Sequence, residues 1–408
     1  MMHISLSNSM LRQIADTFGT PAYVYDMDHI RARTIALRNS LQRQFQISYA
    51  MKANPNRELL SRMRECVDRL DVSSGGELTH AIDAGWSPEL IGFTGPGKRD
   101  VELQLSVDKG IGHIVLESVD EAVRLDLIAA AGNRIQPVLI RISPLSIPQG
   151  FGARMAGKPT QFGIDEEVID EAIQRIAMLP RLRLDGFHVY SGTQCLNAAS
   201  IVEHFRLTLA LFQKVSHRHQ LSPGTLIIGS GLGIPYHETD KPLDIAALGS
   251  EIATLVKAFK TNPPLVDSEL VLETGRFLVG EAGVFLTSVV ATKISRGVQI
   301  CICDGGMNHH LAAAGHLGSV IHRNYPIFKV TDDLPARDQC KPQTLYGPLC
   351  TSIDLLANQI VLPSLKVGDL LAIGSSGAYG LSSSPTGFIS HPLPREIVVD
   401  RKRGGIIA

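Results

Sequence analysis

Residues 270–276 read LVLETGR, and the pattern of the sequence changes where this stretch ends. It joins a short apolar run, typical of a buried strand, to a polar turn. Before it, similar apolar runs alternate with segments that have the i, i+3, i+4 apolar spacing of one-sided helices. After it, strand-like segments follow one another with few helical stretches between them. The sequence thus divides at Arg276 into an α/β part and a β-rich part.

Eight strand-like runs and six clear helical segments make up the first part. The predicted strands are 47–51, 69–72, 90–93, 113–116, 137–142, 184–189, 226–228 and 270–272, and the predicted helices are 57–66, 76–85, 120–130, 166–177, 200–215 and 245–259. Such alternation implies parallel strands joined by right-handed crossovers, and eight strands close a barrel. The predicted fold class is therefore α/β, a (β/α)8 TIM-like barrel, with an open doubly wound sheet as the alternative.

The second part predicts a C-terminal all-β domain. Its strand-like segments are 284–294, 298–303, 327–330, 359–362, 370–373 and 397–399. We assign the first 27 residues to it as well, because a barrel usually begins with its own first strand and TPAYVYD (20–26) resembles an additional one. The expected domains are a barrel over 28–275 and a β-rich domain over 1–27 and 276–408.

Composition excludes several classes of protein. In 408 residues, 44% hydrophobic and 19% charged side chains are typical of a chain with a large core rather than a disordered one. The formal charge of 39 − 40 = −1 argues against nucleic-acid and anionic membrane partners. No apolar run reaches the roughly 18 residues of a membrane span, and neither a signal peptide nor a disulfide framework is recognisable. We expect a cytoplasmic protein.

Unusual polar residues end most of the predicted strands. In an α/β barrel the carboxyl ends of the strands meet at one mouth, where the chemistry lies. These residues are Lys52, 71–74, Arg141, 188–191, 229–233 and 273–276. So many polar groups at equivalent positions indicate a common ligand.

Lys52, in SYAMKANPN (48–56), follows an apolar strand and would project into the barrel. Burial disfavours a charged ammonium, lowers its pKa and makes the amine a nucleophile towards carbonyl groups. The glycines of GSGLGIPY (229–236) let backbone amides approach an anion, and Arg276 could clamp the same phosphate. Glu273 at the barrel axis requires a cationic partner, which a protonated ring nitrogen would provide. An imine-forming lysine, a phosphate cradle and this carboxylate together indicate pyridoxal 5′-phosphate.

Seven ordered motifs resemble those of the fold-type III pyridoxal-phosphate decarboxylases. This family includes the diaminopimelate, ornithine and arginine decarboxylases and is related to alanine racemase. The motifs are YAMKAN (49–54), DVSSGGE (71–77), HVYSGTQ (188–194), GSGLGIPY (229–236), ETGR (273–276), GPLCTSID (347–354) and GAYG (377–380). The resemblance covers nearly the whole chain and implies a barrel joined to a β domain.

The resemblance also implies a role for each matching residue. Lys52 would form the imine with the cofactor, His188 would stack on its ring, and Glu273 would pair with its pyridine nitrogen. Cys350 would return a proton to the substrate carbon, reaching across from the second subunit of a homodimer with shared active sites. The remaining cofactor contacts are Asp71, Glu77 and Arg141 near the ring, and Ser191, Gly229, Ser230, Gly231, Arg276 and Tyr379 at the phosphate or ring.

Two departures from the family concern the substrate. Thr351 stands where the amino-acid decarboxylases carry an acidic residue that meets a distal amino group. The segment after CDGGMN (303–308) lacks the arginine–proline–leucine–tyrosine stretch of the diaminopimelate enzymes. Both features resemble the subgroup of siderophore, antibiotic and exopolysaccharide pathways, which includes decarboxylases of carrier-protein-linked glutamyl groups. We expect Thr351, Asp354 and His310 to contact the substrate.

The predicted activity is decarboxylation of an amino acid or an amino-acid-derived group, free or presented by a carrier protein. The alternatives are a diaminopimelate decarboxylase of lysine biosynthesis, an amino-acid racemase, and a non-catalytic pyridoxal-phosphate protein. His309 with His310, and Cys301 with Cys303, lack a second ligand pair at zinc spacing, so we predict no metal site.

Overall fold

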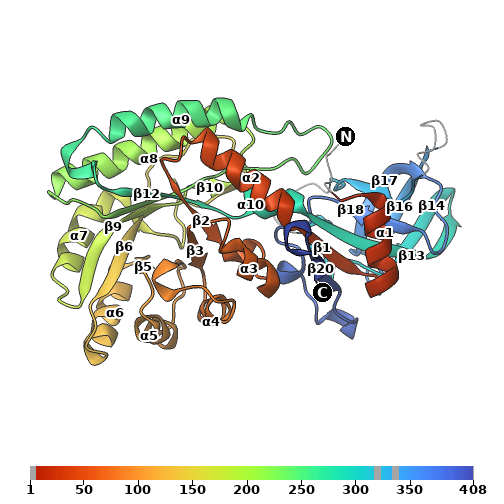
Figure 1. Ribbon diagram of the computed structural model, residues 1–408, viewed down its shortest axis with the longest axis horizontal. Helices are drawn as coiled ribbons and strands as arrows, with labels where there is room; N and C mark the ends of the chain where they lie inside the picture. The colour runs from red at the N-terminus through yellow and green to blue at the C-terminus, as the bar shows by residue number, and fades with distance from the viewer. Residues whose placement is uncertain (1–5, 317–322, 333–339, 408) are drawn as a thin grey trace. The chain divides into compact units, whose positions relative to one another are not determined.

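The computed structural model describes residues 6–316, 323–332 and 340–407. They form two compact units (Figure 1). One consists of 33–233 and 242–275; the other consists of the described residues within 1–32, 234–241 and 276–408. The segment 234–241 therefore belongs to the second unit, although it lies inside the range 28–275 that we expected for the barrel.

The first unit contains a closed barrel of eight parallel strands. In order round the barrel these are β2 (Gln46–Ala50), β3 (Arg69–Val72), β4 (Ile91–Phe93), β5 (His113–Leu116), β6 (Gln136–Ser143), β9 (Leu182–Val189), β11 (Thr225–Gly229) and β12 (Glu269–Thr274). Parallel pairing of β12 with β2, with Glu273 opposite Ser48, closes the ring. This closure confirms the predicted barrel and excludes the open sheet.

One helix precedes the first barrel strand, β2, and the others follow barrel strands. They are α2 (Met27–Ser40, whose first residues belong to the other unit), α3 (Arg57–Met63), α4 (Gly75–Asp83), α5 (Asp100–Lys109), α6 (Val119–Ala131), α7 (Ile169–Ala177), α8 (Ala198–Arg218) and α9 (Ile245–Phe259). Several begin where a side chain caps the first free amides: Ser74 accepts from Glu77 N and Ser118 from Glu121 N, both at 3.1 Å. The long helices α8 and α9 lie side by side (Figure 1).

The second unit is built on a nine-stranded mixed sheet. Along its main path the order is β17 (Leu355–Pro363), β16 (Cys340–Tyr346), β14 (Val298–Cys303), β13 (Gly283–Ser295), β1 (Ala22–Asp26), β19 (Arg395–Asp400) and β20 (Gly405–Ile407); β18 (Leu370–Ile373) pairs with β13 and with β15 (Ile327–Lys329). The predicted β-rich character and the additional N-terminal strand are confirmed, since β1 pairs with β13 and β19. Helix α1 (Asn8–Phe18) packs Leu11 and Ile14 into the core of this unit.

Among the described residues, no helix combines the length and the apolar character needed to cross a membrane.

Candidate active site

The polar ends of the barrel strands carry a buried acid–base pair. Glu273 on β12 and His188 on β9 are at most 2% exposed, and His188 Nε2 donates to Glu273 Oε2 at 2.9 Å. Burial raises the pKa of Glu273, but the hydrogen bond from His188 and the positive charges of Lys52 and Arg141 outweigh it and lower the pKa to about 2. Burial lowers the pKa of His188. The pair is therefore an ionised carboxylate held by an imidazole.

Lys52 lies directly after β2, in the short 3-10 turn Met51–Ala53. Its side chain is half-buried, and Nζ lies 5.4 Å from the centroid of the Tyr190 ring. Only glycine fits at position 275, next to this turn, because a Cβ at position 275 would lie 2.9 Å from Ala53 Cβ. The structure thus places an amine, a carboxylate and an imidazole at the same end of the barrel.

Two further acidic residues lie near the end of β3, Asp71 within the strand and Glu77 in helix α4. Thr94 donates to Asp71 Oδ1 at 2.5 Å, and burial together with the charge of Glu273 raises the pKa of Asp71 well above its usual value. Glu77 Oε2 accepts from Ser73 N at 2.6 Å, and burial raises its pKa as well. Burial near other carboxylates favours the protonated acid at Asp71, which can then donate a hydrogen bond.

Arg141, at the end of β6, forms a buried ion pair that sequence reasoning missed. Its Nη1 lies 2.8 Å from Glu117 Oε1, and the guanidinium carbon lies 4.5 Å from the centroid of the Phe162 ring. Glu117 also accepts a hydrogen bond from Gly163 N at 2.6 Å. It therefore holds both Arg141 and the end of the loop that follows β6. The sequence did point to Glu117, because this residue directly follows the predicted strand 113–116.

The glycine segment after β11 has the geometry of an anion cradle. Gly231 has a φ of +68°, and the position of a Cβ on Gly229 or Gly231 is filled by the rings of Tyr190 and Phe151. Ser230 N donates to Glu273 O at 2.8 Å and ties this turn to β12. Ser191 is 1% exposed and follows β9 closely.

In the second unit, Arg276 is held by tyrosines. Its Nη1 donates to the Tyr236 hydroxyl at 2.6 Å, and its guanidinium carbon lies 4.6 Å from the centroid of the Tyr379 ring. Burial lowers the pKa of Arg276, but the surrounding tyrosines, including Tyr325, outweigh it and raise it overall. Tyr236 was missed as a partner of the arginine, although it ends the glycine motif.

Four enclosed polar atoms on these residues have no hydrogen-bond partner among the described residues. They are Asp71 Oδ2, His188 Nδ1, Ser191 Oγ and Arg276 Nε. Buried polar groups are normally paired, so each of these atoms calls for a ligand or solvent partner. In the barrel unit, a buried serine hydroxyl suits a phosphate, an ionised carboxylate suits a protonated ring nitrogen and a lysine amine suits an aldehyde, so these residues fit pyridoxal phosphate.

The remaining predicted site residues all lie in the second unit. Cys350 is exposed and Thr351 is half-buried. Asp354 is buried and accepts from Met307 N at 2.6 Å and Leu349 N at 2.8 Å, and burial raises its pKa. His310 is fully buried, donates to Ser376 Oγ at 2.9 Å and accepts from Ala313 N at 3.2 Å. Asp354 and His310 therefore order the loops in which they lie.

A family model described as "Pyridoxal-dependent decarboxylase, pyridoxal binding domain" matches residues 27–280. The chain belongs to this family. It is a pyridoxal-phosphate-dependent decarboxylase, as its motifs predicted, and its cofactor is pyridoxal 5′-phosphate.

Curated relatives match almost end to end. The chain is 37% identical to an L-glutamyl-[BtrI acyl-carrier protein] decarboxylase of Niallia circulans, over 98% of this chain and 93% of the relative. It is 30% identical to 2-[(L-alanin-3-ylcarbamoyl)methyl]-2-hydroxybutanedioate decarboxylase of Staphylococcus aureus, over 93% and 94%. A diaminopimelate decarboxylase of Zymomonas mobilis is also 30% identical, over 97% and 91%.

Solved structures share the fold. Diaminopimelate decarboxylase from Helicobacter pylori, complexed with L-lysine, superimposes with a TM-score of 0.85 and 26% identity over 97% of this chain and 95% of the other. AQ1208 from Aquifex aeolicus gives a TM-score of 0.82 and 29% identity over 97% and 90%. The barrel with a β domain is therefore the architecture of the family.

Proposed function

We propose that this enzyme decarboxylates an amino-acid group attached to a carrier protein, with a glutamyl group as the first candidate. The relative that acts on a glutamyl carrier protein supports this substrate, because its 37% identity exceeds the 30% of the Zymomonas diaminopimelate enzyme. Thr351, in place of an acidic residue, and the absence of an arginine–proline–leucine–tyrosine stretch after residue 308 argue against free diamino acids.

The buried Glu273–His188 pair is the observation that carries the mechanism. Bound pyridoxal phosphate supplies an electron sink for the bond between Cα and the carboxylate. Lys52 provides the amine that holds the aldehyde, and the ionised Glu273 keeps a proton on the ring nitrogen. His188 orients that carboxylate through its 2.9 Å hydrogen bond and supports the ring face.

The phosphate contacts are proposed as two sets of donors. Ser191 Oγ, the Ser230 hydroxyl and the amide of Gly231 form one set, with Gly229 leaving room beside them, and Arg276 with Tyr379 forms the other. Asp71 and Arg141 complete the surroundings of the ring, with Glu77 and Glu117 holding the segments that follow β3 and β5.

Proton return to the substrate carbon is assigned to Cys350 of a partner subunit, with Thr351 facing the substrate next to it. An exposed thiol is accessible for such a role. The contacts of Asp354 and His310 favour a structural role for both, in place of the substrate contacts expected from sequence.

Carbon dioxide release tests the proposal. The purified enzyme, loaded with pyridoxal phosphate, is given L-glutamyl carrier protein, free L-glutamate or meso-diaminopimelate. We expect carbon dioxide release from the carrier-linked group only. A Lys52→Ala variant serves as the blank and should release none. Release from meso-diaminopimelate alone would contradict the proposal. Loss of optical rotation without release would identify a racemase.

A further inference from the structure

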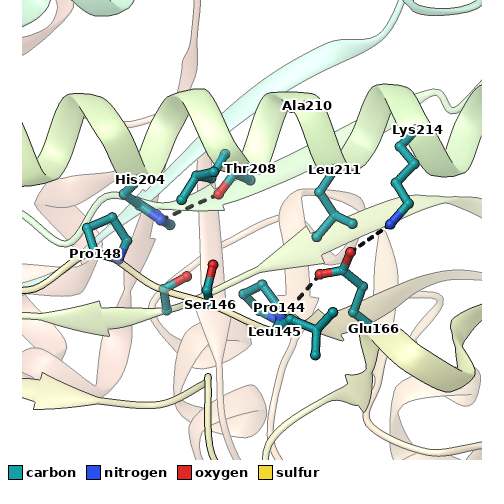
Figure 2. A pocket seen from close by; sticks show the side chains of 12 residues that line it. Pro144, Leu145, Ser146, Pro148, Glu166, His204, Thr208, Ala210, Leu211 and Lys214 are labelled. Carbon is teal, nitrogen blue, oxygen red and sulfur yellow. Dashed lines mark hydrogen bonds and ion pairs between the residues drawn. The ribbon is translucent and has the colours of Figure 1, made fainter.

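The barrel unit contains a groove that shares only Ser191 with the proposed cofactor site. This cavity of about 310 Å³ lies between the loop after β6 and helix α8 (Figure 2). Its apolar walls are formed by Pro144, Leu145 and Pro148 on the loop and by Leu207, Ala210 and Leu211 on the helix. The other half of its lining is polar and consists of Ser146, Glu166, Ser191, His204, Thr208 and Lys214.

The groove is elongated along α8. His204 and Lys214, which line opposite ends in Figure 2, are ten residues apart, which corresponds to about 15 Å along a helix. A cavity with this length and volume has room for a single extended chain of small-molecule size and not for a folded partner.

The inner end of the groove is connected to the anion cradle. His204 is 2% exposed, and its Nε2 donates to Gly229 O at 2.9 Å. Ser191, whose enclosed hydroxyl has no hydrogen-bond partner among the described residues, also lines the groove. A chain seated here therefore ends beside residues assigned to the cofactor phosphate.

The outer end is exposed and carries a cation. Lys214 Nζ lies 2.9 Å from Glu166 Oε1, and about half of the lysine side chain is exposed. Glu166 in turn accepts from Leu145 N at 3.2 Å and fixes the loop wall of the groove (Figure 2). Glu166 is only 15% exposed, so it keeps the lysine at this end of the groove, and the exposed side of the ammonium faces anions from solvent.

We propose that this groove binds the pantetheine arm through which a carrier protein presents its acyl group. Such an arm is linear, with apolar carbon segments separated by two amides, a thioester at the inner end and a phosphate at the outer end. Leu207, Ala210 and Leu211 match its carbon segments, and Ser146 offers a hydroxyl to an amide. Lys214 faces the phosphate. The inference rests on the proposed function, because it names the part of the substrate that free amino acids lack.

A variant that fills the groove tests the proposal. Ala210 is exposed and lines the groove, so an indole from Ala210→Trp takes up space in it without entering the core. With L-glutamyl-S-pantetheine as substrate, we expect KM to rise about tenfold or more and kcat to stay unchanged. The reason is that the groove would bind the arm equally well in the ground state and in the transition state, so its loss weakens binding alone. Ala258→Trp, an exposed alanine on α9 outside the groove lining, is the matched control and should keep the wild-type KM.

Binding without turnover gives an independent readout. Pantetheine and 4′-phosphopantetheine are added to the holoenzyme and followed by saturation-transfer NMR. We expect both to bind the wild type, the phosphorylated one more tightly, and neither to bind Ala210→Trp. Lys214→Ala should remove the difference between the two probes. Cofactor absorbance and melting temperature verify that each variant is folded and loaded.

The outcomes separate this inference from the proposed function. If the wild type decarboxylates glutamyl-S-pantetheine but Ala210→Trp keeps the wild-type KM and pantetheine binding, the groove assignment is wrong and the carrier-linked function stands. If the wild type decarboxylates free glutamate at the same rate as the thioester, the proposed specificity for carrier-linked groups is wrong. The pantetheine binding measurement alone then tests the assignment of the groove. Equal losses in Ala210→Trp and Ala258→Trp would also overturn it.

Discussion

Glu273 shows how one buried residue is fitted to its chemistry. A buried carboxylate normally takes up a proton, yet His188, Lys52 and Arg141 lower the pKa of Glu273 to about 2. An ionised carboxylate can keep a pyridine nitrogen protonated. We expect Glu273→Gln to retain the cofactor, because the phosphate contacts remain, but to lower kcat by about 10²- to 10³-fold, as when one preorganised electrostatic group is lost.

Steady-state kinetics and an absorbance titration with pyridoxal phosphate measure the two effects separately. Glu269→Gln, at the exposed start of the same strand, is the control and should behave as wild type. An unchanged kcat in Glu273→Gln would falsify the assignment of this carboxylate to the ring nitrogen.

Lys52 is the residue on which cofactor attachment depends. Lys52→Ala removes the amine, so the visible absorption of the bound cofactor and all turnover should be lost. Lys109→Ala, at the exposed end of α5, controls for the loss of one positive charge. Turnover at the wild-type rate in Lys52→Ala would show that another group attaches the aldehyde.

At the scale of elements, helix α8 makes stability depend on pH through His204. Burial lowers the pKa of His204 to about 4, from 6.5 in the unfolded chain. Between these values the unfolded chain binds a proton that the folded chain rejects, so stability is full above pH 6.5 and falls as the pH drops towards 4. His204→Gln should weaken this dependence, since a glutamine does not titrate.

Melting temperatures at pH 7.5 and pH 5.0 test this expectation. His113 and His310, with pKa values lowered to about 3 by burial, keep part of the dependence in the variant. His217→Gln, on the exposed face of the same helix, should melt like wild type at both pH values. The expectation is wrong if His204→Gln and His217→Gln lose equal amounts of stability between the two conditions.

The elements that the sequence predicted are those with strong apolar periodicity. Strands 69–72 and 113–116 were predicted with their observed ends, because each ends in an apolar residue, Val72 or Leu116, that is followed directly by a polar one. Helix α5 was missed because its buried face includes Ser106 beside Leu103 and Val107, which weakens the period. Strand β16 was missed because Pro342 and polar residues interrupt it.

Pairings between distant residues could not be predicted from the sequence. The sequence contained Glu117, Arg141 and Tyr236, but no local pattern pairs Arg141 with a carboxylate 24 residues earlier. The hydrogen bond from Arg276 to Tyr236 likewise depends on segment 234–241 joining the second unit, which is a property of the folded chain. Motifs in the sequence indicated most of the proposed site residues. The side chains that hold those residues in place could be identified only in the structure.

At the scale of the whole molecule, we expect the proposed active site to be completed by a second chain. Lys52 belongs to the barrel unit and Cys350 to the other, and we expect each site to combine Lys52 of one subunit with Cys350 of its partner. Most homodimers have twofold symmetry, so two equivalent shared sites would result. Lys52→Ala and Cys350→Ala should each abolish or strongly reduce turnover on its own.

Mixing these two variants distinguishes shared from separate sites. After dissociation and reassociation, half of the dimers are hybrids, and each hybrid has one site with both native residues, so about a quarter of wild-type activity should return if C2 dimers form at random. A mixture of Lys52→Ala with Cys340→Ala should return more, because Cys340 lies outside the proposed site. No recovery in a mixture that forms hybrids would place both residues in one chain's site, since then every site would still lack one of the two groups.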